Sequence, residues 1–438
     1  MQGFENQGNI EAALVAAKAG NPEAQFRVAM AAFRQGNEND FRHWIQQSAG
    51  QEFPPAMFRL GTWRMSHTLS PTDLEDAKGL VKKAANLGFV NAVRAMAVFS
   101  LRGAGRYPDW AEGMGWFKKA LELNDSRAYR EAALLLRNNP GNEEHTKGLL
   151  MHAANAGDVI ACFHLGCWMM EAPLKDIQDE GLFWLGLSLK GGHVLAAREL
   201  EPYRDRTLRQ PGGNLPDLNW PEIEAKLSEI SEPFTPKESK VFLDDPRART
   251  VENVLEKWEC DYVVQRASRR LEPAQTSESV DQNQTASQYR TNSAAKFWMM
   301  QQDIVLAMID RKISIAAETP VDFAEDLVVL HYKPGERYFP HCDSFLPDLP
   351  EQAAEIDLKG QRIRTILVYL NDDYEEGETY FLFADKKIKL KTGGALIFEN
   401  ITEEGDPDEH SVHEGLSVKT GQKWLASKWI RDKSQVLY

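Results

Sequence analysis

The chain has 438 residues, which exceeds one ordinary hydrophobic core and predicts two or three domains. Its 42% hydrophobic and 26% charged residues are typical of a soluble globular protein. The net charge of −14 argues against nucleic-acid binding driven by phosphate contacts.

The first residues, MQGFENQGNIEAALVAAKAG, lack a basic head, a continuous apolar run and a cleavage site. No other stretch approaches the roughly 20 apolar residues that a membrane helix needs. The four cysteines are too few for a disulfide framework, and free thiols in a reducing compartment are the simpler interpretation. These features predict a cytoplasmic protein without membrane partners.

A small-residue signature, as in AKAGNPEAQF and AANAGDVIAC, recurs between residues 8 and 203. Its six alignable alanines are Ala24, Ala56, Ala92, Ala128, Ala161 and Ala196. They lie 32 to 36 residues apart, a period typical of helical hairpins that stack because each is too thin to bury its own apolar face. Glycines in the signature, such as Gly20 and Gly157, fit the turn between the two helices of a hairpin.

The signature resembles Sel1-like repeats, the variant of the tetratricopeptide family with the pattern AA-x-x-G-x-x-x-A. Two copies depart from it: Asn124 replaces the turn glycine, and the second copy has an insertion ending in Pro54-Pro55. The resemblance implies an α-helical repeat solenoid over 8–203 whose surface binds a protein partner. A structural cap or a dimerisation surface is the alternative.

Two stretches have the composition of loops. Prolines and a glycine pair mark 204–240 as a linker, with one short helix from Pro221 to about Ile230. The polar stretch 273–293 is poor in apolar residues and lies inside the following domain. It is interpreted as a mobile loop that closes over a substrate, with plain disorder as the alternative.

From about residue 320 the apolar residues follow a period of two, which predicts β-strands separated by turns. The expected strands are EDLVVLHYK, RTILVYL, TYFLF, KIKL, ALIFEN and KWLASKWI. Many short strands after a helical lead-in predict a double-stranded β-helix, or jelly roll, whose mouth holds a metal and a small ligand. The expected fold class is therefore multidomain α + β, with the repeat solenoid followed by a jelly-roll domain over 241–434.

His341, Asp343 and His413 predict a metal site with open coordination positions. Two imidazoles and one carboxylate on one face of Fe(II) leave room for a bidentate co-substrate and O2. His341 and Asp343 are two residues apart, so both side chains point to one side of an extended segment. Cys342, between them, points away and is assigned to packing.

Lys423 is the informative addition to this set. Lys423 and Trp429 differ by six positions, so both face the interior from the last strand. A buried lysine needs an anionic partner, and a carboxylate of 2-oxoglutarate meets that need. The alternative is a lysine that extends to the rim of the barrel.

The segment from about 240 to 433 resembles the prolyl 4-hydroxylase branch of the Fe(II)- and 2-oxoglutarate-dependent dioxygenases. The matching stretches are HYKPGERYFPHCDSF, RTILVYLNDDYEEGETYF, TGGALIFEN and HSVHEGLSVKTGQKWLASKW. The resemblance implies that His341, Asp343 and His413 bind iron and that Lys423, Tyr332 and Thr379 contact 2-oxoglutarate. It also places Trp429, Glu325 and Arg290 at the substrate pocket, and it implies O2 as a co-substrate and ascorbate as a further cofactor.

The sequence departs from the family pattern at several positions. Glu376-Gly377 replaces a double glycine, and the acidic insertion 344–361 follows the metal pair, where we expect it to shape substrate entry. His410 is a rival for the third ligand position, but only His413 has the family's H-x-G context.

The leading hypothesis is a hydroxylase of a protein or peptide substrate, most readily at proline, with the repeats recruiting a protein partner. Two alternatives remain. One is an interaction scaffold whose dioxygenase domain is inactive or only senses oxygen and 2-oxoglutarate. The other is a hydroxylase of a small molecule.

Overall fold

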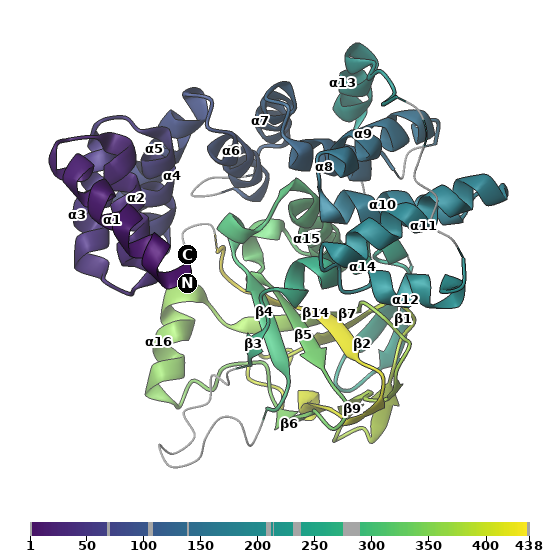
Figure 1. Ribbon diagram of the computed structural model, residues 1–438. Coiled ribbons are helices and arrows are strands. Elements are labelled where there is room, and N and C mark those ends of the chain that lie inside the picture. The colour runs from purple at the N-terminus through teal and green to yellow at the C-terminus, as the bar shows by residue number, and fades with distance from the viewer. Residues whose placement is uncertain are drawn as a thin grey trace. The chain divides into compact units, whose positions relative to one another are not determined.

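The computed structural model describes residues 2–67, 71–103, 108–137, 140–206, 212, 214–230, 238–274 and 290–435 (Figure 1). The chain divides into two compact units, unit 1 (Met1–Ala128) and unit 2 (Tyr129–Val436). None of the helices in these ranges combines the length and the apolar character needed to cross a bilayer.

Unit 1 consists of helices that follow one another along the chain. They are α1 (Gln2–Lys18), α2 (Pro22–Arg34), α3 (Glu38–Gly50), α4 (Pro54–Met65), α5 (Pro71–Asn86), α6 (Val90–Arg102) and α7 (Trp110–Glu122), with the first turn of α8 (Ser126–Leu136). Neighbouring helices contact each other, as expected of helical hairpins.

The repeat signature has a structural explanation in both units. All six signature alanines are buried, and each lies in the second helix of a hairpin, where a small side chain permits close packing. The turn glycines Gly20 and Gly157 have φ angles of 94° and 86°. Two copies have another residue at the left-handed position and keep the turn, because Glu52 and Asn124 have φ angles of 55° and 56° there.

The remaining helices belong to unit 2. They are α9 (Glu143–Asn155), α10 (Val159–Met170), α11 (Lys175–Lys190), α12 (Ala196–Leu200), α13 (Trp220–Glu229), α14 (Lys257–Ser268), α15 (Ile304–Ala316) and α16 (Pro350–Lys359). Helix α13 confirms the short helix expected in the linker. The predicted mobile loop falls mainly on residues 275–289, which lie outside the described residues.

Two antiparallel sheets form the jelly roll of unit 2. The eight-stranded sheet has the order β1 (Ser239–Leu243), β2 (Ala248–Val251), β11 (Ala395–Glu399), β7 (Arg362–Tyr369), β14 (Lys423–Arg431), β5 (Leu327–Tyr332), β4 (Ser293–Phe297) and β3 (Glu272–Pro273). The four-stranded sheet has the order β10 (Lys386–Ile388), β9 (Thr379–Phe381), β12 (His413–Gly415) and β6 (Tyr338–His341). A short pair joins β13 (Val418–Thr420) to β8 (Glu375–Glu376).

An apolar core lies between the sheets. Leu330, Leu367 and Leu425 of the large sheet and Phe381 and Ile388 of the small sheet belong to one buried cluster. Helices α14 and α15 lie between the repeat helices α8–α10 and the strands β5, β7 and β14 (Figure 1). The large sheet therefore has the metal-site core on one face and helices on the other.

The fold class is confirmed, and so are the strands predicted after residue 320. Strands also form before residue 320, where the sequence showed no period of two, because β1, β2 and β4 join the large sheet from the preceding segment. Two of these strands lack an extended alternation of large apolar residues, as ARTV of β2 and SAAKF of β4 illustrate. Pairing with longer neighbouring strands stabilises them.

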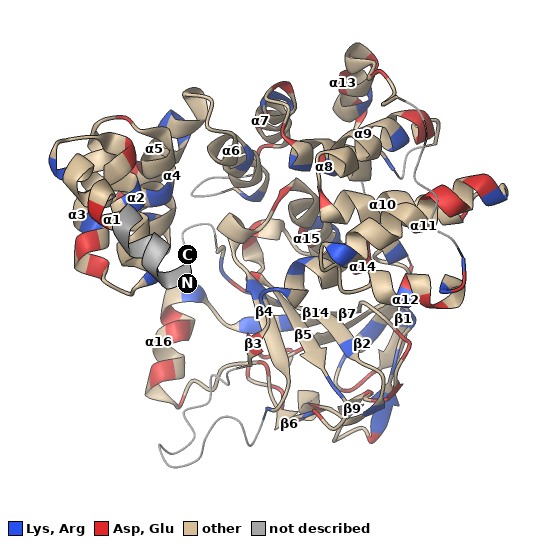
Figure 2. Ribbon diagram, viewed as in Figure 1, with Lys and Arg blue, Asp and Glu red and all other residues tan. Residues whose placement is uncertain are grey.

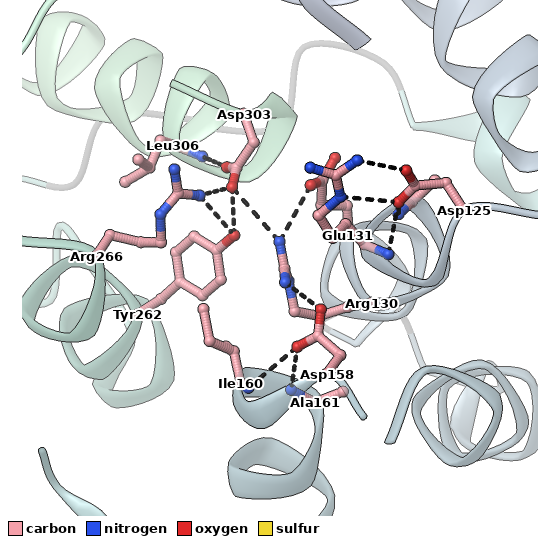
Figure 3. A network of polar contacts seen from close by, with 12 residues as sticks. Asp125, Arg130, Glu131, Asp158, Ile160, Ala161, Tyr262, Arg266, Asp303 and Leu306 are labelled. Carbon is pink, nitrogen blue, oxygen red and sulfur yellow. Dashed lines mark hydrogen bonds and ion pairs between the residues drawn. The ribbon is translucent and has the colours of Figure 1, made fainter. Parts of the chain in front are cut away.

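A buried arginine connects the repeat helices of unit 2 to the jelly-roll domain (Figure 3). Arg130 of α8 is 4% exposed and contacts Asp158 at 2.5 Å, Glu131 at 3.1 Å and Asp303 at 3.6 Å. Asp158 caps α10 and Asp303 caps α15, while the hydroxyl of Tyr262 on α14 donates to Asp303 at 2.6 Å. Arg266 of α14 also pairs with Asp303, so α8, α10, α14 and α15 share one set of charges.

We expect Arg130→Met to lower the free energy of unfolding by about 3–5 kcal/mol, because it leaves the buried carboxylate of Asp158 without its cation, while Asp303 keeps its ion pair with Arg266. The matched control is Arg204→Met, since Arg204 pairs with Glu201 on the surface, where an ion pair contributes about 0–1 kcal/mol. Calorimetric thermal unfolding measures both. Equal destabilisation by the two variants would contradict a stabilising role for the Arg130 network.

Candidate metal centre and its two cavities

The small sheet brings the three predicted metal ligands together. His341 and His413 lie directly opposite each other on the antiparallel strands β6 and β12. Their Nε2 atoms are each 3.8 Å from a carboxylate oxygen of Asp343. Ligand atoms of the three residues all lie within 4.8 Å of one another, a spacing that suits one metal ion.

The surroundings hold the two imidazoles ready for a metal. Nδ1 of His341 is 2.8 Å from the carbonyl oxygen of Phe339, and Nδ1 of His413 is 3.1 Å from that of Ser411. Donation from Nδ1 leaves Nε2 as the free acceptor that faces Asp343. Burial, with the nearby His413, lowers the pKa of His341 to about 3, which keeps this ring neutral and able to bind a metal.

Asp343 remains a carboxylate although it is buried. Burial alone would raise its pKa, but His413, His341 and the hydroxyl of Thr365 together hold the pKa below its ordinary value. Thr365 donates to Oδ2 of Asp343 at 2.6 Å and also contacts the side chain of Asn400. The third ligand is therefore charged and fixed in orientation from behind.

A small inner cavity of about 30 Å³ adjoins the three ligands. It is lined on its other sides by Lys423, Tyr332, Thr379, Leu425 and Trp429, among others. Tyr332 is 2% exposed and Thr379 is likewise buried, and its hydroxyl is 2.9 Å from that of Tyr369. The structure thus brings the predicted co-substrate contacts into one enclosed space with the metal ligands.

Lys423 is fully buried, and its Nζ donates to the carbonyl oxygen of Gly377 at 2.7 Å. Within the part of the chain that the structure describes, no carboxylate oxygen lies within 4 Å of this nitrogen. Burial lowers the pKa of Lys423 to about 7. A dicarboxylate in the inner cavity would supply the missing counter-charge, so the residues present fit 2-oxoglutarate.

The same strand offers an internal comparison. Lys428 of β14 is also fully buried, but it points to the helical face of the sheet and pairs with Asp310 of α15. Lys423, Leu425, Ser427 and Trp429 alternate with it and line the inner cavity. One strand therefore carries two buried lysines: the protein supplies the carboxylate partner of Lys428, and a ligand would supply that of Lys423.

A larger outer groove of about 770 Å³ opens beside the metal ligands. Asp343, Arg290 and Trp429 line it, so Arg290 and Trp429 border both cavities. Cys342 also lines the groove and is absent from the group of ligand atoms. Its predicted orientation away from the metal agrees with this, and its packing role stays a prediction.

Glu325 differs from its predicted place at the substrate pocket. Its carboxylate contacts Nε of Arg362 at 2.6 Å and Nε of Arg431 at 2.5 Å, and it lines neither cavity. Arg362 in turn lies over the ring of Trp429, with its guanidinium carbon 4.1 Å from the ring centroid. Glu325 therefore acts on the pocket indirectly, by positioning Arg362.

His410 lies away from the ligand group of His413. Its Nδ1 is 2.8 Å from Asp245, and its ring stacks on Phe383. The acidic insertion folds into α16, and Arg431 contacts Glu355 of that helix. None of the insertion's residues, all of which are described, lines the outer groove, so the expectation that it shapes substrate entry finds no support there.

Sequence reasoning missed two residues of the site. Tyr338 stacks on His341 with ring centroids 3.5 Å apart and borders both cavities. Its position three residues before His341, inside the quoted motif, was an available signal. Arg362 carried no such signal, because only the folded sheet places it beside Trp429.

Comparisons with known proteins agree with this geometry. Residues 327–431 match the model of the 2OG-Fe(II) oxygenase superfamily. The chain is 33% identical to the Arabidopsis thaliana protein named probable prolyl 4-hydroxylase 10, over 43% of this chain and 69% of that protein. It is 31% identical to prolyl 4-hydroxylase 1 of the same plant, over 43% of this chain and 70% of the relative. The chain belongs to the prolyl 4-hydroxylase family of 2OG-Fe(II) oxygenases.

Membership of this family makes the protein a 2-oxoglutarate-dependent dioxygenase that uses Fe(II), 2-oxoglutarate and O2. The chain is also similar to a Sel1 repeat protein from Oxalobacter formigenes, whose crystal structure aligns with a TM-score of 0.39 and 24% identity. That alignment covers 47% of this chain and 89% of the other. The repeat character of this chain is evident from its own periodic alanines and turns.

We expect Lys423→Met to raise the free energy of unfolding of the protein without ligands, because it removes a buried charge that has no carboxylate partner. Lys428→Met is the matched control and should lower it by about 3–5 kcal/mol, since the buried carboxylate of Asp310 loses its cation. Thermal unfolding with and without 2-oxoglutarate measures both effects. Stabilisation by 2-oxoglutarate should disappear only in Lys423→Met, and its persistence there would contradict the assignment.

The lowered pKa of Lys423 also predicts the direction in which the stability of the protein changes with pH. Between about pH 7 and 10.5 the unfolded chain binds a proton at this lysine that the folded protein does not. The wild type without ligands should therefore gain stability relative to Lys423→Met as the pH rises through that range. Chemical unfolding at pH 7 and pH 9 tests this, and a constant difference between the two proteins would contradict it.

Proposed function

We propose that the protein hydroxylates a protein or peptide substrate, most readily at proline, using His341, Asp343 and His413 to hold iron. The observation that carries the proposal is Lys423, which is buried across the inner cavity from the metal ligands and has no carboxylate oxygen of the described residues within 4 Å of its Nζ. A cation there fixes the far carboxylate of 2-oxoglutarate, so that its other end faces the metal. Tyr332 and Thr379 complete the walls that hold it.

When bound, iron with 2-oxoglutarate and O2 supplies the oxidising power to insert oxygen into an unactivated C–H bond, giving succinate and CO2 from the co-substrate. The chain's own residues provide orientation and enclosure. Thr365 fixes Asp343, and the backbone carbonyls fix the histidines. Trp429 and Tyr338 separate the inner cavity from the groove through which a substrate would approach.

The outer groove has room for a substrate beside the co-substrate. Its volume of about 770 Å³ is much larger than that of the inner cavity and accommodates a short segment of extended chain or a small molecule. The names of the relatives refer to hydroxylation of proline residues. We therefore place the target proline beside Trp429, next to the metal.

Purified protein should convert 2-oxoglutarate to succinate only when Fe(II) is present, and a hydroxylated peptide should gain the mass of one oxygen atom. His413→Ala should abolish both iron binding and turnover, because it removes a ligand. His410→Ala is the control and should retain both, since His410 pairs with Asp245 elsewhere. Turnover that survives His413→Ala but not His410→Ala would overturn the ligand assignment, and absence of turnover in the wild type would favour a scaffold.

We also infer that the repeats recruit the protein that is hydroxylated, because stacked helical hairpins present extended surfaces suited to recognition. In unit 1, Leu87 is 54% exposed and Phe33 is 42% exposed. The double variant Phe33→Ser and Leu87→Ser should raise the KM for an intact protein substrate and leave the KM for a short peptide unchanged. Equal effects on both substrates would contradict recruitment by this surface.

A further inference from the structure

The outer groove has a charge that differs from that of the whole protein. The chain carries a net charge of −14, yet five side chains that line the groove are cationic. They are Arg269, Arg270, Arg290, Lys296 and Arg362. Among the described residues, the carboxylates that line it are those of Glu272 and the metal ligand Asp343. Figure 2 shows basic segments beside β3 and β4 of unit 2, where the groove lies.

These cations differ in how far the protein neutralises them. Arg362 pairs with Glu325 in a buried contact, and Lys296 lies 3.4 Å from the carboxylate of Asp326. Arg269 and Arg270 are exposed, and neither has a carboxylate partner within 4 Å among the described residues. Their charges are therefore available to a ligand in the groove.

The two arginines are held in place by neutral groups. A guanidinium nitrogen of Arg269 donates to the carbonyl oxygen of Gly191 at 2.7 Å, in the turn that follows α11. The guanidinium of Arg270 lies 5.8 Å from the ring centroid of Phe297 on β4. Both contacts orient a cation without cancelling its charge, as a recognition site requires.

The rest of the lining suits a peptide. Trp298, Tyr338 and Trp429 provide aromatic surface between the arginines and the metal ligands, and Gln301 adds a polar amide. Aromatic rings pack well against proline and aliphatic side chains, while the arginines match carboxylates in geometry and charge.

We propose that this groove selects protein segments that carry Asp or Glu a few residues from the hydroxylated position, with those carboxylates bound by Arg269 and Arg270. The inference rests on the proposed function and adds a substrate class to it. It also gives the last repeat a part in catalysis, because the turn after α11 positions Arg269. The repeat array thereby contributes to the recognition groove itself.

Three peptides that differ only beside the target proline test the proposal, with Asp, Asn or Lys at the flanking positions. Binding is measured by fluorescence anisotropy and hydroxylation by mass spectrometry, at low salt and at about 0.5 M NaCl. The wild type should favour the Asp peptide over the Asn peptide by roughly five- to tenfold in both Kd and kcat/KM, and high salt should reduce the difference.

Arg270→Glu should reverse the preference, weakening the Asp peptide and improving the Lys peptide. Lys391→Glu is the matched control, because it changes the net charge equally at a side chain that is 93% exposed and does not line the groove. This control should keep the wild-type preference. A second variant, Arg269→Gln, should also reduce the preference, and circular dichroism verifies that each variant is folded.

The outcomes separate the substrate class from the reaction. Equal binding of the Asp and Asn peptides, an unchanged preference in Arg270→Glu, or displacement of the peptide by single-stranded RNA at similar concentration would overturn the proposal. Preferential binding of the Asp peptide without any hydroxylation would support the charge selection and contradict the proposed reaction. Hydroxylation of all three peptides at equal efficiency would support the proposed reaction and contradict the charge selection.

Discussion

The buried ammonium group of Lys423 is the constraint on which the candidate site depends. A cation removed from water needs a nearby anion, and the surrounding fold offers it one backbone carbonyl. The strands that enclose it also place the metal ligands across the same small cavity. The protein therefore stores an unfavourable electrostatic interaction that a dicarboxylate relieves, and part of the binding free energy of the co-substrate comes from that relief.

Alternation along β14 explains how one strand serves both the site and the fold. Every second residue from Lys423 to Trp429 lines the inner cavity, while Lys428 faces α15 and is neutralised by Asp310. A shift of register by one residue would turn Lys423 toward the helices and Lys428 toward the cavity, so that both would lie in the wrong environment. The ion pair with Asp310 thus fixes the register that holds Lys423 in the cavity.

Much of this arrangement could be predicted because it depends on local spacing. The period of the alanines indicated helical hairpins, and the two-residue steps from His341 to Asp343 and along β14 placed side chains on one face. The prediction that failed depends on contacts between segments that are distant in the sequence. Glu325 was assigned to the pocket, but Arg362 and Arg431 hold it in ion pairs that no spacing reveals.

Backbone conformation accounts for one departure from the family pattern. Glu376 stands where the family has a glycine, and it has a φ angle of 60°, a conformation that side chains adopt at some cost. Gly377 beside it, with a φ angle of 72°, presents the carbonyl oxygen that receives the Lys423 ammonium. The family's double glycine can therefore be understood as a backbone requirement of the lysine site.

The position of Arg130 limits how this protein can be divided. The change from helices to strands near residues 204–240 resembles a junction between separable modules, yet the buried charges of α8, α10 and α15 belong to one compact unit. Recombination at that junction would expose half of an electrostatic network on each fragment. The last repeats and the catalytic sheets therefore form one cooperative unit, whereas the hairpins before α8 belong to the other compact unit.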